Sequence, residues 1–417
     1  MRSAQLIAYA VVVALATPIF AQQAVPIRAL APVDAKATQQ FGNIFSVRQL
    51  PGGKILVNDG VRRQLTVLDN ELANPRIVID SVSEGGQSYG PRATPTIPYL
   101  GDSTLFVDAV SQALVLIDPA GKIVRVISAP KPQDIRLLGR SASGVDARGN
   151  LIYRGDFQEA AKGIATGPEQ VPPTFADTVP VVRANFETRV IDTIAAMKAN
   201  PPSVGQDSKT ADGKPAFRFR LHPLPVIDEW AVLSDGAIAI VRGHDYHVDF
   251  IRPDGKRESA AKLPFDFKRL TDEDKQKLVD SVRASEISRR QTARLVPGSN
   301  ASSTESGVRR GPQVAPVILY DIVPLKEIPD YYPPIRTGAV KADADGNMWI
   351  LPTTSAQSAV GELIYDVVNN RGVMIERVRL PVGRSIAGFG RGGIVYLMSK
   401  GNDNLWILER TTVLRRK

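Results

Sequence analysis

The feature that most constrains the fold of this chain is a Gly-containing turn that recurs six times. Each turn stands directly before a short run rich in Val, Ile, Leu and Trp. The six turns contain Gly52, Gly101, Gly149, Gly236, Gly346 and Gly392. Three of the five separations are 49, 48 and 46 residues, the length of a four-stranded propeller blade at roughly 40–50 residues. The others, 87 and 110, match one blade plus an insertion. We therefore predict an all-β, six-bladed β-propeller of four-stranded antiparallel blades.

The first blade shows how the strands are recognised. Ile44–Leu50, Lys54–Val57, Gln64–Leu68 and Arg76–Ile79 are short apolar or alternating runs separated by turn residues, which is the pattern of half-buried strands. The last blade has no fourth run of its own. Because an apolar segment, Ala24–Leu30, precedes the first blade, we expect it to supply that outer strand and close the ring.

Three polar or Pro-rich stretches interrupt the blade pattern, near 156–178, 200–215 and 264–332. We expect the second to be a long loop. In the third, Thr271-Asp272-Glu273-Asp274 resembles a capping box, and acidic residues favour a helix N-terminus. A helix is predicted from there through Gln291, followed by a loop, so that a helix-plus-loop insertion separates blades four and five.

The first 21 residues have the pattern of a secretory signal peptide. Arg2 precedes an apolar core at Leu6–Leu15, and Ile19–Ala21 ends in a small residue suited to cleavage. We predict a signal peptide at 1–21 and a single propeller domain at 22–417, with an uncut N-terminal membrane helix as the alternative. The expected location is periplasmic or secreted, with no membrane anchor after cleavage.

Composition excludes several chemistries. The sequence has no cysteine, so it has no disulfides, thiol nucleophile, Cys-type zinc site or lipid-anchoring Cys. The formal net charge is +9, a modest excess for this length, and no basic run is interleaved with aromatic residues. Nucleic-acid binding is therefore not expected, whereas anionic ligands are weakly favoured. No nucleophile elbow, phosphate loop or dinucleotide fingerprint is present.

The expected binding surface is one end of the central channel. The loops between second and third strands and the links between blades gather on this channel face, where propellers commonly bind ligands. Arginine and aromatic residues are frequent in those segments, and both are typical contact residues. The predicted ligand-binding residues are Arg62, Arg92, Arg154, Trp230, Arg242, His244, Tyr246, Tyr331, Tyr332, Arg336 and Arg384.

Metal chemistry is a second possibility on the same face. Four carboxylates fall in its loops, and a ring of carboxylates suits Ca²⁺ or another divalent ion. These residues are Asp59, Asp108, Asp156 and Asp228. The alternative is that each Asp holds its own loop through bonds to the backbone. His244 is either a ligand or general base, or a surface residue of the loop Arg242–His247; three residues along a strand reverse the facing direction of His247.

The turn Asp343–Trp349, the segment Val232–Val241 and the run Leu65–Asp69 resemble the blades of secreted six-bladed propellers of the NHL and TolB-like kind. The resemblance covers nearly all of the chain after the signal and implies the fold rather than an activity. Relatives of this architecture include gluconolactonase-type lactonases and a metal-dependent lyase. The lactonases place a Glu-Gly-Pro near the first inner strand, where this chain has Phe41–Phe45.

These observations favour an exported, non-enzymatic propeller that binds a partner protein of the envelope or a small anionic ligand on its channel face. No cofactor is expected for that function. The alternatives are a metal-dependent hydrolase or lyase that uses His244 and the four carboxylates, and an envelope scaffold whose insertions contact other proteins. We expect neither nucleic acid nor a membrane as a partner.

Overall fold

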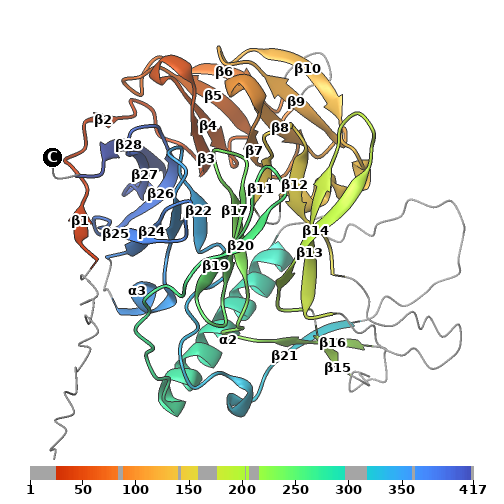
Figure 1. Cartoon of the computed structure of the whole chain (residues 1–417), viewed down its shortest axis with the longest axis vertical. Coiled ribbons are helices and arrows are strands. Elements are labelled where there is room, and N and C mark those ends of the chain that lie inside the picture. Colours follow the sequence, from red (N-terminus) through yellow and green to blue (C-terminus); the bar gives the residue numbers. More distant parts are fainter. Residues whose placement is uncertain are drawn as a thin grey trace, which may run out of the picture.

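The computed structural model describes residues 25–82, 88–139, 142–157, 176–201, 203–205, 216–295, 317–358 and 362–414. Six sheets surround a common centre, each with its first strand innermost (Figure 1). The prediction of a six-bladed β-propeller with four-stranded antiparallel blades is confirmed. The expected signal peptide at 1–21 lies outside the described residues. No helix in the described parts of the chain is long and apolar enough to span a membrane.

The blades follow one another along the chain. Blade one contains β3 (Ile44–Gln49), β4 (Ile55–Asp59), β5 (Gln64–Leu68) and β6 (Arg76–Ile79). Blade two contains β7 (Thr96–Pro98), β8 (Thr104–Asp108), β9 (Ala113–Ile117) and β10 (Ile123–Ser128). Blade three contains β11 (Ser143–Val145), β12 (Leu151–Arg154), β13 (Thr178–Ala184) and β14 (Ile191–Lys198).

The remaining blades keep the same order. Blade four contains β17 (Glu229–Val232), β18 (Ile238–Arg242), β19 (His247–Ile251) and β20 (Arg257–Ser259). Blade five contains β22 (Val340–Ala342), β23 (Met348–Ile350), β24 (Ile364–Val368) and β25 (Met374–Arg379). Blade six contains β26 (Arg384–Phe389), β27 (Ile394–Lys400) and β28 (Trp406–Thr412). Short helices lie in the turns and links: η1 (Pro51–Gly53), η2 (Leu100–Asp102), η3 (Pro132–Asp134), α1 (Ile135–Leu138), η4 (Leu325–Glu327) and α3 (Thr353–Ser358).

The core is divided among the contacts between neighbouring blades. One cluster joins Leu56 and Leu65 of blade one to Phe106 and Val115 of blade two, all at most 1 % exposed. Because both faces of a middle strand pack against adjacent blades, its residues are buried without alternation, as all five residues of β4 are. This burial, at about 25 cal/mol per Å² of apolar surface, stabilises the ring blade by blade.

The N-terminal segment closes the ring, but in two places. β1 (Ile27–Ala29) pairs parallel with β25 as a fifth strand of blade five, whereas β2 (Ala35–Lys36) pairs antiparallel with β28 as the outer strand of blade six. This corrects the expectation that Ala24–Leu30 is the blade-six strand; within it only Leu30 bridges to Val413, and Ala24 lies outside the described residues. A segment of this length can cover two neighbouring outer edges in turn (Figure 1).

The insertions form more structure than the sequence predicts. β15 (Ser203–Gly205) and β16 (Ala216–Leu221) form a separate three-stranded sheet with β21 (Val317–Ile322), which pairs parallel with β16. The stretch expected to be a loop at 200–215 therefore contributes a strand, and the first insertion is described only at its ends. The alternation of apolar and polar residues in β16 and β21 is short and flanked by polar residues. It is therefore too weak to predict that two strands almost 100 residues apart would pair.

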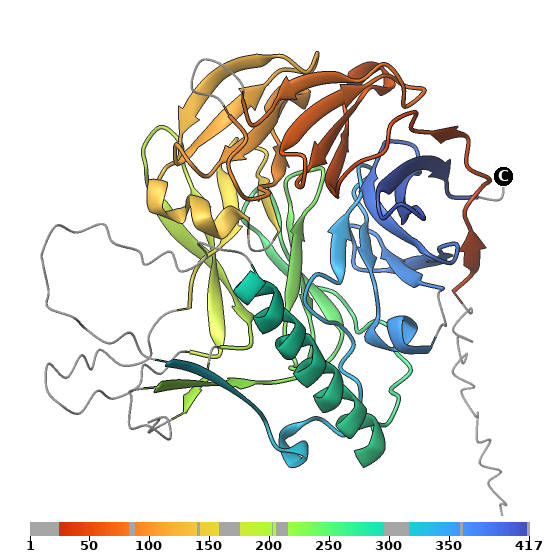
Figure 2. The same cartoon turned by 180° about the vertical axis from the view of Figure 1, so that it is seen from behind.

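The predicted helix is confirmed as α2 (Asp272–Leu295). Thr271 Oγ1 accepts a bond from the Asp274 amide at 3.2 Å, and Asp274 accepts one from the Thr271 amide at 3.1 Å, so the capping box is formed. In the first half of the helix, Val279 packs against Val323 and Ile328. Leu278 contacts the links that precede blades four and five, and the helix crosses that side of the ring (Figure 2).

Candidate functional site

The antiparallel order of each blade gives the ring two different ends. The loops from second to third strands and the links between blades lie at one end, here called the loop face. The turns from first to second strands lie at the other end, here called the turn face. All residues predicted for ligand binding belong to segments of the loop face, so this face is described first.

Asp59 organises the loop face of blade one. Its carboxylate accepts bonds from the backbone amides of Gly42 at 2.7 Å, Asn43 at 3.0 Å, Val61 at 3.1 Å and Arg62 at 3.0 Å. The side chain is buried, and both oxygens are occupied by these amides. Asp59 therefore holds two loops together, which is the structural role considered for it from the sequence.

An aspartate holds the corresponding loop of blade two in the same way. Asp108, at the end of β8, accepts bonds from the amides of Val110 at 3.0 Å and Ser111 at 3.3 Å. Between the two loops, Arg63 donates to the carbonyls of Tyr89 at 2.6 Å and Gly90 at 2.9 Å. Each loop is fixed by a charged side chain bonded to backbone, so the surface over blades one and two is rigid.

Buried polar groups hold the link between these blades. Tyr89 donates to Asn58 Oδ1 at 2.6 Å, and Asn58 donates to the Thr94 carbonyl at 2.7 Å. Tyr89 is fully buried, and burial raises the pKa of its hydroxyl to about 12. The link packs so closely on blade one that a β-carbon at Gly60 would lie 2.7 Å from the Ala93 side chain.

Three apolar side chains nevertheless point outward from this rigid surface. Phe45 is 41 % exposed, Val61 67 % and Val110 64 %. Gly60, next to Val61, lies by Phe45 and by Ala93 of the link between the blades, and Gly90 of the same link lies by Val110. Arg62 and Arg92 are exposed beside them. We call these five residues the blade one–two patch. Sequence analysis predicted the two arginines and did not single out the three apolar residues.

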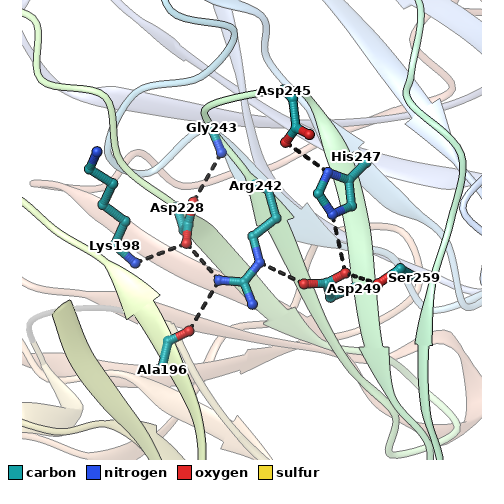
Figure 3. A network of polar contacts seen from close by, with 9 residues as sticks. All are labelled: Ala196, Lys198, Asp228, Arg242, Gly243, Asp245, His247, Asp249 and Ser259. Carbon is teal, nitrogen blue, oxygen red and sulfur yellow. Dashed lines mark hydrogen bonds and ion pairs between the residues drawn. The ribbon is translucent and has the colours of Figure 1, made fainter.

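Arg242 lies in a network that joins blades three and four (Figure 3). Its guanidinium donates to Asp228 Oδ2 and to Asp249 Oδ2, each at 2.7 Å, and to the Ala196 carbonyl at 3.1 Å. The two carboxylates raise the pKa of Arg242 despite the opposing effect of burial. Asp228 also accepts from the Lys198 and Gly243 amides. Arg242 and Asp228 thus connect the blades, and neither presents a free charge to solvent.

His244 and His247 lie in different surroundings. His247 Nδ1 lies 2.9 Å from Asp245 Oδ1, and its Nε2 lies 3.2 Å from Asp249 Oδ1. Ser259 donates to the same Asp249 carboxylate (Figure 3), so the serine is bonded to the aspartate rather than to the imidazole, and no activated nucleophile results. His244 is exposed on the loop between the two strands, which matches the surface alternative.

The structure buries three aromatic residues that the sequence placed on the channel face. Trp230 is 1 % exposed in the core between blades three and four. Tyr246, also 1 % exposed, donates to Asp366 Oδ2 at 2.7 Å, and burial raises its pKa well above the ordinary value. Tyr332 packs under α2 with Leu270. These positions are corrected: each side chain turns into a contact between elements, which alternation within one segment does not reveal.

The other predicted residues are dispersed. Arg384 is paired with Glu409 Oε2 at 2.8 Å, and Asp156 with Arg136 at 2.7 Å. Arg154 is partly buried, whereas Arg336 and Tyr331 are exposed near the start of blade five. Each of the four carboxylates proposed for a metal therefore has its own hydrogen-bond network. Within the described ranges, no three His, Cys, Asp or Glu side chains are grouped so that they could hold a metal ion.

Glu229 is a titratable residue of the loop-face end that the sequence reasoning did not single out. It opens β17 and is buried. Burial raises its pKa to about 7, although the Gly338 amide and the charge of Arg154 act in the opposite direction. A carboxyl whose pKa is near neutrality changes charge under mild conditions. The only sequence signal was a charged residue at the start of an apolar strand.

Comparison with known proteins gives distant structural similarity. No family model matches the chain, and no curated protein sequence matches it. Among solved structures, it is similar to a candidate exported protein from Bacteroides fragilis, with 9 % identity over 93 % of this chain and 100 % of that one and a TM-score of 0.43. A catalytically inactive virginiamycin B lyase from Staphylococcus aureus, solved with quinupristin, has 10 % identity over 91 % and 98 % and a TM-score of 0.39.

A gluconolactonase from Xanthomonas campestris has 9 % identity over 93 % of this chain and 98 % of that one, with a TM-score of 0.36. At this identity the similarity concerns the fold, and a fold hosts many unrelated functions. The chain is a six-bladed β-propeller with distant structural neighbours among such proteins.

Proposed function

We propose that the protein is an exported, non-enzymatic propeller that binds a partner protein of the cell envelope through the loop face of blades one and two. The observation that carries this proposal is the blade one–two patch. It combines three outward apolar side chains with two exposed arginines. Asp59 holds the loop of Val61 and Arg62, and Asp108 holds the loop of Val110. Soluble surfaces rarely group apolar residues in this way without a binding role.

The composition of the patch favours a protein over a small molecule. The centres of protein interfaces are apolar, and arginine is enriched there relative to lysine. A partner that presents apolar side chains flanked by acidic residues would satisfy both Val61 and the two arginines.

The rigidity of the patch also supports binding. Side chains and loops that are already ordered lose little conformational entropy on association. Asp59 holds the loop of Val61 and Arg62 by four backbone bonds, and Arg62 Nε lies 3.8 Å from Asp59 Oδ2, a distance that leaves most of its donors available. Arg92 is also exposed.

Export is supported by the N-terminal pattern alone. The positive residue, apolar core and small residue at position 21 are typical of a signal peptide, and the absence of cysteine is compatible with an oxidising compartment. The resemblance of the blades to secreted NHL and TolB-like propellers agrees with this location. We place the partner in the same compartment for that reason.

Site-specific photo-crosslinking tests the function. A photoreactive amino acid at Val61 should form one discrete adduct with a partner in cells that produce the protein. The same residue at Val124, which is 55 % exposed on the outer strand β10, is the matched control and should form none. Combining the Val61 probe with Arg62→Glu and Arg92→Glu should remove the adduct.

The experiment has three informative outcomes. An adduct at position 61 alone that is sensitive to the arginine changes supports the proposal. Equal adducts at positions 61 and 124 would indicate nonspecific proximity, and no adduct at either position would contradict a partner on this surface. Purified variants should retain the wild-type thermal midpoint, because Arg62 and Arg92 are exposed and surface substitutions change stability little.

A further inference from the structure

A cavity of about 860 Å³ lies at the centre of the ring and opens at the turn face. Inner strands of all six blades line it, together with the turns that follow them. This end of the channel is opposite the blade one–two patch, so a ligand here would be independent of the partner proposed above. The volume is in the range of small-molecule sites, roughly 300–1,000 Å³.

The wall of the cavity is polar for a topological reason. Each inner strand is the edge strand of its sheet, so half of its peptide groups face the channel instead of a neighbouring strand. At one level of the inner strands, two residues before the first residue of the following turn, blades three and six carry Gly144 and Gly388. A β-carbon at either position would meet Val232 or Val47 of the neighbouring blade.

At the same level, two blades carry a cation: Arg48 in blade one and Lys341 in blade five. Both line the cavity. The Arg48 guanidinium already donates to the Ser103 carbonyl and to Thr104 Oγ1. Lys341 has no hydrogen-bond or ion-pair partner among the residues that the structure describes. Its side chain lines the cavity and is exposed to the solvent of the channel.

Four carboxylates line the cavity, Asp102, Asp146, Asp235 and Asp343, and none of these is bonded to Lys341. Asp146 accepts bonds from the Arg148 and Asn150 amides, and Asp235 accepts one from the Ala237 amide. Asp343 accepts bonds from the amides of Asp345 and Asn347 and from the Trp349 indole. Asp102 is paired with Arg391 at 2.9 Å. Partial desolvation by the channel wall lowers the pKa of Lys341, and no carboxylate offsets that effect. The side chain is nevertheless exposed to the channel, where an ammonium without a counter-charge is stabilised by a bound anion.

We propose that the central cavity is a binding site for a small oxyanion, a carboxylate or phosphate, that pairs with the ammonium of Lys341. The free peptide N–H groups of the inner strands complete its hydrogen bonding, and Arg48, two blades away from Lys341 around the ring, contributes further positive charge. A neutral ligand would leave the ammonium unpaired, and a cation would be repelled by Lys341 and Arg48. The shared chemistry of the ligand is therefore one oxyanion group on a molecule small enough for the channel.

Calorimetric titration of the full chain with inorganic phosphate and, separately, with succinate tests this site. We expect saturable binding of at least one of the two at pH 7 and low ionic strength. Lys341→Met should weaken that binding tenfold or more. Lys122→Met, at an exposed turn of blade two, removes the same charge and should keep the affinity within twofold. Phosphate without succinate binding would identify a phosphate site, and the reverse a carboxylate site.

Stability separates loss of binding from loss of folding. Because Lys341 is exposed to the channel, Lys341→Met without ligand should have a thermal midpoint close to that of the wild type. The ligand should raise the midpoint of the wild type and not that of the variant. Absence of saturable binding of both probes to the wild type overturns the proposal. Binding that is equally tight in Lys341→Met also overturns it.

Discussion

At the scale of single residues, the chain uses aspartate mainly to fix backbone. Asp59 and Asp108 follow second strands and bond the amides of the loops they open. Asp343 does the same in a turn and also accepts the Trp349 indole. A carboxylate has two oxygens and can accept several bonds at once. The same residue type that suggested metal binding therefore explains why the loops are rigid.

Asp59 gives the sharpest test of this role. Asp59→Ala leaves four backbone amides without their acceptor in a buried site, so we expect a loss of about 3 kcal/mol in the free energy of unfolding. Asp69→Ala is the matched control, because Asp69 also accepts two backbone amides but on an exposed turn. Denaturant unfolding should show a much smaller loss there, and equal losses would contradict the explanation.

Glu229 predicts a pH dependence of stability. Its pKa is about 7 in the folded protein against an ordinary value of 4.5, so folding favours the protonated form. No penalty exists below pH 4.5, where the carboxyl is protonated in both states. Stability falls as pH rises from 4.5 to 7, and above 7 the full penalty, on the order of 3 kcal/mol, applies.

Glu229→Gln should remove this dependence and make the protein more stable than the wild type at pH 8, while the two are similar at pH 4. Glu187→Gln, at an exposed turn, is the control and should follow the wild-type curve. Urea unfolding at several pH values checks the prediction. A Glu229→Gln profile that parallels the wild type from pH 4 to 8 would assign the effect to other groups.

At the scale of elements, helix α2 depends on its own N-terminus. Its first half makes a few apolar contacts, such as Val279 with Ile328 of the same insertion. Ile287 in its second half is 52 % exposed. Tertiary packing therefore covers only part of the helix, and local signals such as the capping box carry more of its stability.

Thr271→Ala should destabilise the helix by about 1 kcal/mol, because the Thr271 hydroxyl is the acceptor for the Asp274 amide. Ser285→Ala changes an exposed residue inside the same helix and should be neutral or slightly stabilising, since alanine favours helix. Amide hydrogen exchange should show faster exchange in the first turns of α2 for Thr271→Ala only. Unchanged exchange there would mean that packing alone holds the helix.

At the scale of the whole molecule, the ring is closed by contacts between the two ends of the described chain. Arg28 pairs with Glu376 at 2.7 Å, and Arg410 pairs with Asp34 at 3.0 Å. Thr411 donates to the Ala31 carbonyl at 2.7 Å. β1 and β2 cover the outer edges of blades five and six (Figure 1), and uncovered edges are prone to pair with other chains.

Truncation tests this closure. A chain that begins at Ala37 lacks β1 and β2, and we expect its free energy of unfolding to fall by roughly 3 kcal/mol or more through lost hydrogen bonds. It should also associate through the exposed edges of β25 and β28. A chain that begins at Val25 retains both strands and is the control. Thermal unfolding with light scattering checks both effects, and equal stability of the two chains would exclude a closing role.

The sequence alone was sufficient for the blades, because turn residues and strand alternation are local properties. The periodic Gly turns, Thr271 with its helix and the six-bladed ring were all predictable from them. Side-chain placement was not: Trp230, Tyr246 and Asp59 lie in similar segments, yet adjacent blades and links decide which are buried. The tertiary structure alone brought Phe45, Val61 and Val110 together, moved the closing strand to β2 and left Lys341 unpaired in the channel. Those features depend on contacts between blades that are distant in sequence, which no local pattern encodes.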